Sequence, residues 1–116
     1  MRVLVADDNR DAVLTLSALL WDEGHVVDEV HNGAEVLDAM RSFKPDAVLL
    51  DIKMPGLSGY DVARLIRSRY GSLPLLIAIS GHYRKTSDRI LAEMVGFDHH
   101  LPKPCDPHAL LSLLRL

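Results

Sequence analysis

Cysteine is almost absent from this sequence, and long apolar runs are missing altogether. The single cysteine, Cys105, cannot form an internal disulfide, which agrees with a reducing compartment. No apolar stretch approaches the roughly 20 residues of a membrane-spanning helix, and no charged leader precedes a long apolar core at the N-terminus. We therefore expect a cytoplasmic domain without membrane insertion.

An excess of basic residues is also missing. The formal net charge is −3, so the chain lacks the basic footprint of a nucleic-acid-binding domain, and no direct nucleic-acid binding is expected. The first apolar run, residues 3–6, is followed by Asp7 and Asp8 and not by the Gly- or Ser/Thr-rich phosphate loop of a flavin or nucleotide carrier. Because two acids there would repel phosphate, we discount such a carrier.

The remaining composition is that of an ordinary globular domain. With 116 residues, 48% of them hydrophobic and 25% charged, the chain fits one domain and is unlike a disordered segment. The last helical pattern still runs at Leu116, so we expect a domain cut from a longer protein.

Strand-like apolar runs alternate with helical patterns five times along the chain. Strands are predicted at residues 2–6, 26–30, 46–50, 75–79 and 97–101. Helices are predicted at residues 10–22, 34–43 and 59 to about 69, and then around residues 90–95 and 110–114. Strict alternation of this kind predicts a parallel sheet covered by helices on both faces.

The polarity of the runs predicts which strands lie at the centre of the sheet and which lie at its edges. Residues 2–6, 46–50 and 75–79 are almost wholly apolar, as central strands are, whereas residues 26–30 and 97–101 are mixed and belong at the edges. The order 2-1-3-4-5 satisfies this pattern and defines an α/β class: a flavodoxin-like, doubly wound, five-stranded parallel sheet with five helices. Trp21 and the leucines of the last helix are predicted to pack in the core.

Acidic residues stand where two central strands end. Asp7 and Asp8 follow the first strand, and Asp51 follows the third. Because the carboxyl ends of parallel neighbours share one edge, the three carboxylates are expected to converge there. At about 4 Å and an effective dielectric constant of about 20, each pair repels by roughly 4 kcal/mol, which demands a divalent cation or raised pKa values. The sequence therefore predicts a magnesium-dependent acidic pocket.

Two further residues are predicted to reach the same edge. Ser80 ends the fourth strand, and Lys103 follows the fifth strand between two prolines that stiffen its loop. The lysine ammonium is a point charge suited to an anion. Acids, hydroxyl and lysine together predict a site for magnesium and a phosphoryl group, with Asp51 as the nucleophile, since a carboxylate can form an aspartyl phosphate.

Plain structural roles are the alternatives for these residues. One of Asp7, Asp8 or Asn9 could cap the first helix, although a single cap would not account for both acids. Ser80 could be a turn hydroxyl and Lys103 a solvated surface charge. Zinc binding is not expected, because no Cys/His spacing supports it.

At these positions the chain resembles, along its whole length, the receiver domain of two-component response regulators. The resemblance rests on Asp7-Asp8, Asp51, Met54-Pro55, Gly59, Ser80-Gly81 and Lys103-Pro104. It implies that residues 1–116 form a receiver domain that acts as a phosphorylation-activated signalling switch. Such a domain is not a conventional enzyme, although it assists its own phosphorylation and dephosphorylation.

The resemblance also implies a role for each acid. Asp51 is the expected phosphoacceptor. Asp8 and Asp51 are expected to bind Mg²⁺ through their side chains and Asp7 through a water molecule, with the backbone carbonyl of Lys53 completing the protein ligands.

Further expectations concern the phosphoryl group and its partners. Ser80 and Lys103 are expected to hold the phosphoryl oxygens, and the Lys103–Pro104 peptide bond is expected to be cis. The expected donor is the phosphohistidine of a histidine kinase or a histidine phosphotransfer protein. Phosphorylation is expected to change the face built from the fourth helix, fifth strand and fifth helix, while the kinase, the stimulus and the downstream partner stay open.

The chain departs from the family at two positions. His100 stands where the family often has an aromatic switch residue. Two roles stay open for it: a switch residue that acts with Ser80, or an exposed edge-strand residue without a role in switching. Lys53, two residues after Asp51, is expected to alter the access of attacking water and so the phosphoryl lifetime.

Residues 8–11 and 96–101 look most like receivers appended to hybrid sensor kinases. The alternative function is a phosphate-independent receiver-like binding module, which a failure to bind magnesium would favour.

Overall fold

A parallel sheet of five strands forms the centre of the structure, a computed structural model that describes residues 1–81 and 86–115. The strand order is β2-β1-β3-β4-β5, which confirms the predicted order and its two edge strands. The strands are β1 (Arg2–Ala6), β2 (Val26–Val30), β3 (Ala47–Asp51), β4 (Leu75–Ser80) and β5 (His99–Pro102).

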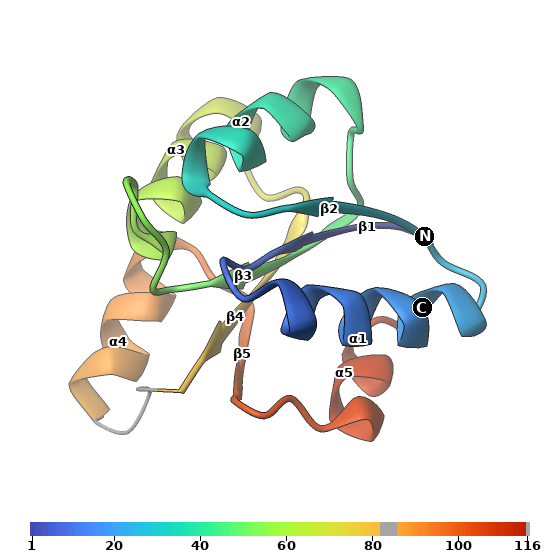
Figure 1. The fold of residues 1–116 in the computed structure, drawn as a ribbon. Helices are drawn as coiled ribbons and strands as arrows, with labels where there is room; N and C mark the ends of the chain where they lie inside the picture. Colours follow the sequence, from blue (N-terminus) through green and yellow to red (C-terminus); the bar gives the residue numbers. More distant parts are fainter. Residues whose placement is uncertain (82–85, 116) are drawn as a thin grey trace.

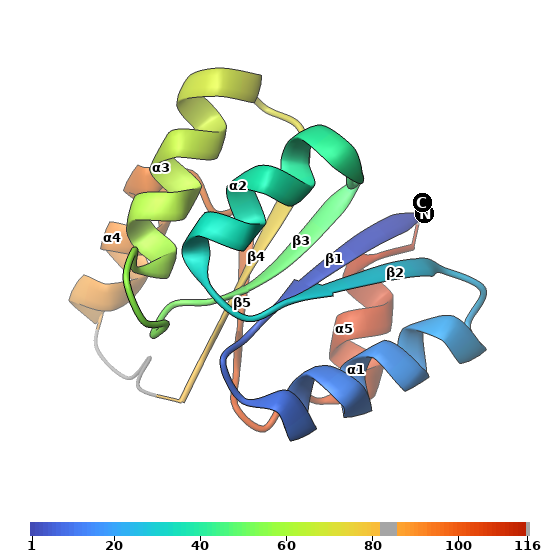
Figure 2. The ribbon, with the colours of Figure 1, turned by 45° about the horizontal axis from the view of Figure 1, so that its top comes forward.

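Helices cover both faces of the sheet, as the alternating pattern predicts. They are α1 (Arg10–Asp22), α2 (Gly33–Ser42), α3 (Gly59–Tyr70), α4 (Thr86–Val95) and α5 (Pro107–Leu113). Helices α1 and α5 lie on one side, and α2, α3 and α4 lie on the other (Figures 1 and 2). No helix in residues 1–81 and 86–115 is long and apolar enough to cross a bilayer.

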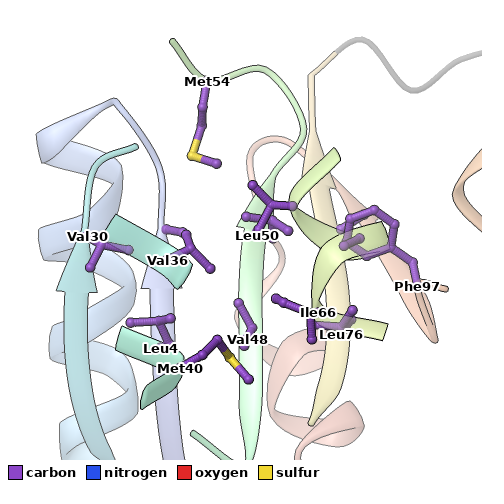
Figure 3. Packing of buried hydrophobic residues seen from close by; sticks show 14 of the residues in the cluster. Leu4, Val30, Val36, Met40, Val48, Leu50, Met54, Ile66, Leu76 and Phe97 are labelled. Carbon is purple, nitrogen blue, oxygen red and sulfur yellow. The ribbon is translucent and has the colours of Figure 1, made fainter. Parts of the chain in front are cut away.

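The two sides of the sheet carry separate hydrophobic clusters. Val48 and Leu50 point from β3 toward α2 and α3, where Val36 and Ile66 are fully buried (Figure 3). Leu49 points to the other side, into the cluster that α1 and α5 cover. Because successive side chains of a strand alternate between faces, a central strand buried on both sides must be apolar throughout.

Strand β5 begins two residues later than predicted. The apolar Phe97 reads as a strand residue, but it is buried ahead of β5 and packs edge-on against Tyr60 of α3, with ring centroids 6.5 Å apart. The strand ladder starts only after Asp98, whose backbone N–H donates to the carbonyl of Leu76 at 2.8 Å. Burial by a neighbouring helix, and not strand pairing, therefore explains the apolar residue at this position.

The prediction that Trp21 packs in the core is wrong. Val13, Leu16 and Leu20 form the buried side of α1, and Trp21 is turned away from it with 54% of its surface exposed. In α5 the same prediction holds for Leu110, which is fully buried.

Candidate functional site

Three carboxylates lie together where β1 and β3 end. Asp7, Asp8 and Asp51 each offer an oxygen, and these oxygens lie within 4.8 Å of one another. Asp7 and Asp51 are buried, whereas Asp8 is exposed. Closely spaced carboxylate oxygens are the donors that a hard divalent cation such as Mg²⁺ prefers, so this donor set fits the metal that the sequence suggests.

The N-cap residue of α1 is Asn9, and not one of the two acids before it. Its side-chain oxygen accepts hydrogen bonds from the backbone N–H groups of Asp11 at 3.0 Å and Ala12 at 3.2 Å, so Asn9 is the N-cap of α1. The backbone N–H of Asn9 in turn donates to Asp7 Oδ1 at 3.0 Å. The turn before α1 therefore holds the Asp7 carboxylate in place, and Asn9 caps the helix.

A glycine brings the start of α3 against the end of β3. A Cβ atom on Gly59 would lie 2.6 Å from the Cα of Ile52 and 2.7 Å from the carbonyl oxygen of Asp51, closer than real Cβ contacts come. The Gly59 N–H donates to the Ile52 carbonyl at 2.8 Å. Only glycine permits this approach, which anchors the loop directly behind Asp51.

Lys103 connects the two buried acids. Its Nζ atom lies 2.8 Å from Asp7 Oδ2 and 3.2 Å from Asp51 Oδ2. Its backbone N–H donates to the carbonyl of Ser80 at 3.2 Å, which ties the loop after β5 to the end of β4. The Lys103–Pro104 peptide bond is cis, as the family resemblance implies.

Burial and this shared cation give the two acids different acidities. Burial, followed by the charge of Asp7, raises the pKa of Asp51 from 3.8 to about 6. Burial opposes ionisation of Asp7 too, but hydrogen bonds from Lys103 and Asn9 outweigh it and lower the pKa of Asp7. Although burial alone would lower the pKa of Lys103, its two carboxylate partners raise it, so the lysine is a firmly held cation.

An open hollow of about 500 Å³ gives access to this edge. Its lining includes Asp8, Asp51, Lys53, Ser80 and Lys103. The Lys53 N–H donates to Asp51 Oδ1 at 3.2 Å while its side chain is exposed. Ser80 is buried as the last residue of β4. The hollow can therefore admit a small anion to a carboxylate, a hydroxyl and an ammonium together.

His100 lies apart from that hollow. It is a half-buried residue of β5, paired with Ala78 of β4. Burial is the main cause that lowers its pKa; the charge of Arg89 lowers it further, and Glu93 opposes the shift. The structure thus places His100 beside α4 and on β5, which β4 separates from β3 and Asp51.

The sequence matches one protein family over nearly its whole length. The family model described as "Response regulator receiver domain" matches residues 3–115. The response regulator MprA of Mycobacterium avium is 38% identical over 115 residues, which are 99% of this chain and 50% of that protein. The chain thus spans about half the length of the curated relatives it matches.

Solved receiver structures share the fold. A signal receiver domain of a response regulator from Bermanella marisrubri is 31% identical, with a TM-score of 0.86 over 97% of this chain and 93% of that one. The BeF3-activated N-terminal receiver domain of RstA from Klebsiella pneumoniae has a TM-score of 0.91 over 99% of this chain and 96% of that one. At 23% identity, the second likeness concerns the fold alone.

Proposed function

We propose, from the premise that this chain belongs to the response regulator receiver domain family, that it is a switch which accepts a phosphoryl group on Asp51. Receiver domains are signalling switches of two-component systems and not conventional enzymes, and their family implies histidine kinase partners. The observation that supports Asp51 is its position: a buried carboxylate at the end of β3, 3.2 Å from the Lys103 ammonium and open to the hollow.

Transfer to Asp51 exchanges one bond to phosphorus for another. An oxygen of the Asp51 carboxylate attacks the phosphorus of a phosphohistidine on the partner, and the bond from phosphorus to the imidazole nitrogen breaks. That nitrogen keeps the electron pair and takes up a proton from water. The attack requires an ionised carboxylate, and a pKa of about 6 leaves Asp51 mostly ionised near neutral pH.

The acids around Asp51 suit Mg²⁺, which family receivers bind at an acidic pocket. Asp8 and Asp51 would hold the ion through their side chains, Asp7 through water, and Lys53 through its backbone carbonyl. When bound, the ion would neutralise the carboxylates and the incoming phosphoryl oxygens. Lys103, which already contacts Asp51 at 3.2 Å, and Ser80 would hold the remaining phosphoryl oxygens.

The signal would leave through the face made by α4, β5 and α5. Three apolar side chains of α4 are exposed: Ile90 at 51%, Leu91 at 40% and Met94 at 79%. Exposed apolar residues gathered on one helix mark a contact surface. A phosphoryl group held by Ser80 at the end of β4 acts one strand away from this surface and would change its affinity for a downstream protein.

Incubation with Mg²⁺ and acetyl phosphate tests the acceptor. Intact mass should show one added phosphoryl group that hydroxylamine removes, and Asp51→Asn should not gain it. Asp61→Asn, which changes an exposed acid in the first turn of α3, is the matched control and should behave as wild type. A hydroxylamine-labile adduct on Asp51→Asn would contradict the assignment. A wild-type protein that gains no adduct would favour the phosphate-independent binding module.

A further inference from the structure

Arg67, near the end of α3, holds four oxygen atoms at once. Its Nε donates to the carbonyl of Gly96 at 2.9 Å, and its Nη1 donates to the carbonyls of Gly71 at 3.1 Å and Pro74 at 2.8 Å. Its Nη2 donates to Asp98 Oδ2 at 2.8 Å. The side chain is only 17% exposed. We call this arrangement the Arg67 clamp; it joins the end of α3, the loop before β4 and the connection from α4 to β5.

The clamp also fixes the start of β4. Asp98 Oδ2, which accepts from Arg67, accepts from the backbone N–H of Leu76 at 2.8 Å as well. The Asp98 N–H donates to the Leu76 carbonyl at 2.8 Å. One carboxylate oxygen therefore accepts hydrogen bonds from both the Arg67 guanidinium and the backbone of β4. Such charge-assisted hydrogen bonds are about twice as strong as neutral ones.

The C-terminal end of α4 is pressed against the stem of Arg67. Gly96 has a φ of +110°, which favours glycine, and a Cβ atom there would lie 2.4 Å from Arg67 Cγ. The N–H groups of Gly96 and Phe97 close the helix by donating to the carbonyls of Glu93 at 3.1 Å and Ala92 at 3.0 Å. The Arg67 side chain thus packs directly against the backbone at this helix end, where a glycine leaves room for it.

The two ends of α4 consequently differ. Its first residue, Thr86, comes six residues after Ser80 in the sequence, whereas Gly96, directly after its last turn, accepts a hydrogen bond from Arg67. We propose that the Arg67 clamp is the fixed pivot of α4, so that changes caused by phosphorylation enter the helix from the Ser80 side and stop at Gly96. This inference rests on the proposed function, because it requires a phosphoryl group on Asp51 to affect α4.

A pivot and a purely structural contact predict different responses to activation. We would measure amide hydrogen exchange with and without Mg²⁺ and beryllium trifluoride, a stable mimic of the phosphoryl group. In wild type, exchange should change in α4 and stay constant at Gly96, Phe97 and Asp98. In Arg67→Gln, the exchange rates of these three amides should also change on activation, by about tenfold. A factor of this size corresponds to the loss of one hydrogen bond to a charged group. Arg67→Lys keeps the charge without the fork and should give the same extension if the glutamine variant does not fold.

Two control variants separate the pivot from general destabilisation. Arg64→Gln changes an exposed arginine one turn earlier in α3, 3.5 Å from Asp61, and should keep the wild-type pattern. Val13→Ala lowers stability in the opposite core cluster and should also confine the response to α4. The pivot proposal is overturned if both Arg67 variants keep the wild-type pattern. It is also overturned if the response in Val13→Ala extends to the same three amides as in the Arg67 variants. A wild type in which no amide responds overturns the proposed function, and the pivot with it.

Discussion

Asp7 and Asp51 contact the same ammonium, yet their pKa values move in opposite directions. Asp7 has the shorter contact to Lys103, 2.8 Å against 3.2 Å, and accepts a backbone N–H as well, so it stays ionised. Burial, and then the charge of Asp7, raises the pKa of Asp51 to about 6. Without a metal ion, Asp51 is therefore the acid of this pair that takes up a proton first.

Asp51→Asn should stabilise the metal-free protein near neutral pH. Because the folded pKa of Asp51 exceeds its ordinary value of 3.8, the folded state binds this proton more tightly than the unfolded chain does. The resulting stability is fully present below 3.8 and is lost as pH rises to about 6. Above that range the buried charge costs at most roughly 3 kcal/mol, which the amide avoids. Urea unfolding in a chelator across this pH range should show a growing advantage for the variant, and parallel pH profiles would contradict the assignment.

Magnesium should stabilise the folded protein, because a bound cation relieves the repulsion among three carboxylates. A ligand at about 100 times its Kd adds roughly 2.7 kcal/mol. Asp8→Ala should remove most of this effect in thermal melts. Asp11→Ala, which deletes an exposed acid of the first turn of α1, should keep it. A wild-type melt that millimolar magnesium leaves unchanged would argue against the acidic pocket.

Ser80→Ala should accept a phosphoryl group and yet switch incompletely. Contacts from Ser80 and Lys103 to the new anion are worth roughly 1.5 to 3 kcal/mol each. Together they approach the roughly 5.5 kcal/mol of a near-complete two-state shift. Amide spectra of the fully phosphorylated proteins should show smaller changes in α4 and β5 for the variant, and Ser72→Ala, at an exposed serine before β4, should match wild type. Equal changes in Ser80→Ala would refute the role.

His100 should make the response of α4 sensitive to acid. A neutral ring tolerates an inward position beside β4, whereas a protonated ring favours water. The sequence alone places this change near pH 6.5, and because burial lowers the pKa of His100, the response should weaken only as pH falls below that value. Activation-dependent amide shifts, compared at each pH between wild type and His100→Phe, test this. If both proteins lose the response in parallel, His100 has no part in the switch.

Ser17→Ala should leave stability unchanged or increase it by about 1 kcal/mol. Within residues 1–81 and 86–115, Ser17 Oγ is the buried side-chain oxygen without a hydrogen-bond partner. A buried hydroxyl without a partner costs roughly 1 to 3 kcal/mol, and alanine is the better helix former. Denaturant unfolding measures the change. Ser112→Ala removes a hydroxyl that donates to the His108 carbonyl at 2.9 Å, and it should gain nothing. A clear loss in Ser17→Ala would show that the hydroxyl is satisfied.

The central and edge strands could be predicted from their polarity, and the order 2-1-3-4-5 fits both this pattern and the family resemblance. A strand buried on both faces must be apolar throughout, so Val48-Leu49-Leu50 marks a centre and Asp28-Glu29 marks an edge. The start of β5 could not be predicted in this way, because the sequence does not distinguish an apolar strand residue from one, like Phe97, that a helix buries.

The convergence of the site acids could be predicted from the sequence, whereas the Arg67 clamp could not. The acids stand directly after strands, so the topology alone brings Asp7 and Asp51 to one edge. The Arg67 clamp had no such signal, because three of its four acceptors are backbone carbonyls and the fourth, Asp98, lies 31 residues away. Any residue type has a carbonyl, so contacts of this kind leave no trace in the sequence.

The outward position of Trp21 decides what intrinsic fluorescence can report. It is the only tryptophan, and it lies near the C-terminal end of α1, roughly 17 Å along the helix axis from Arg10 at the acidic edge. With 54% of its surface exposed, its indole emits from a largely aqueous setting in the folded protein. Emission should therefore change little when Asp51 is phosphorylated and only modestly on unfolding. An optical assay of this switch requires a fluorophore placed on α4.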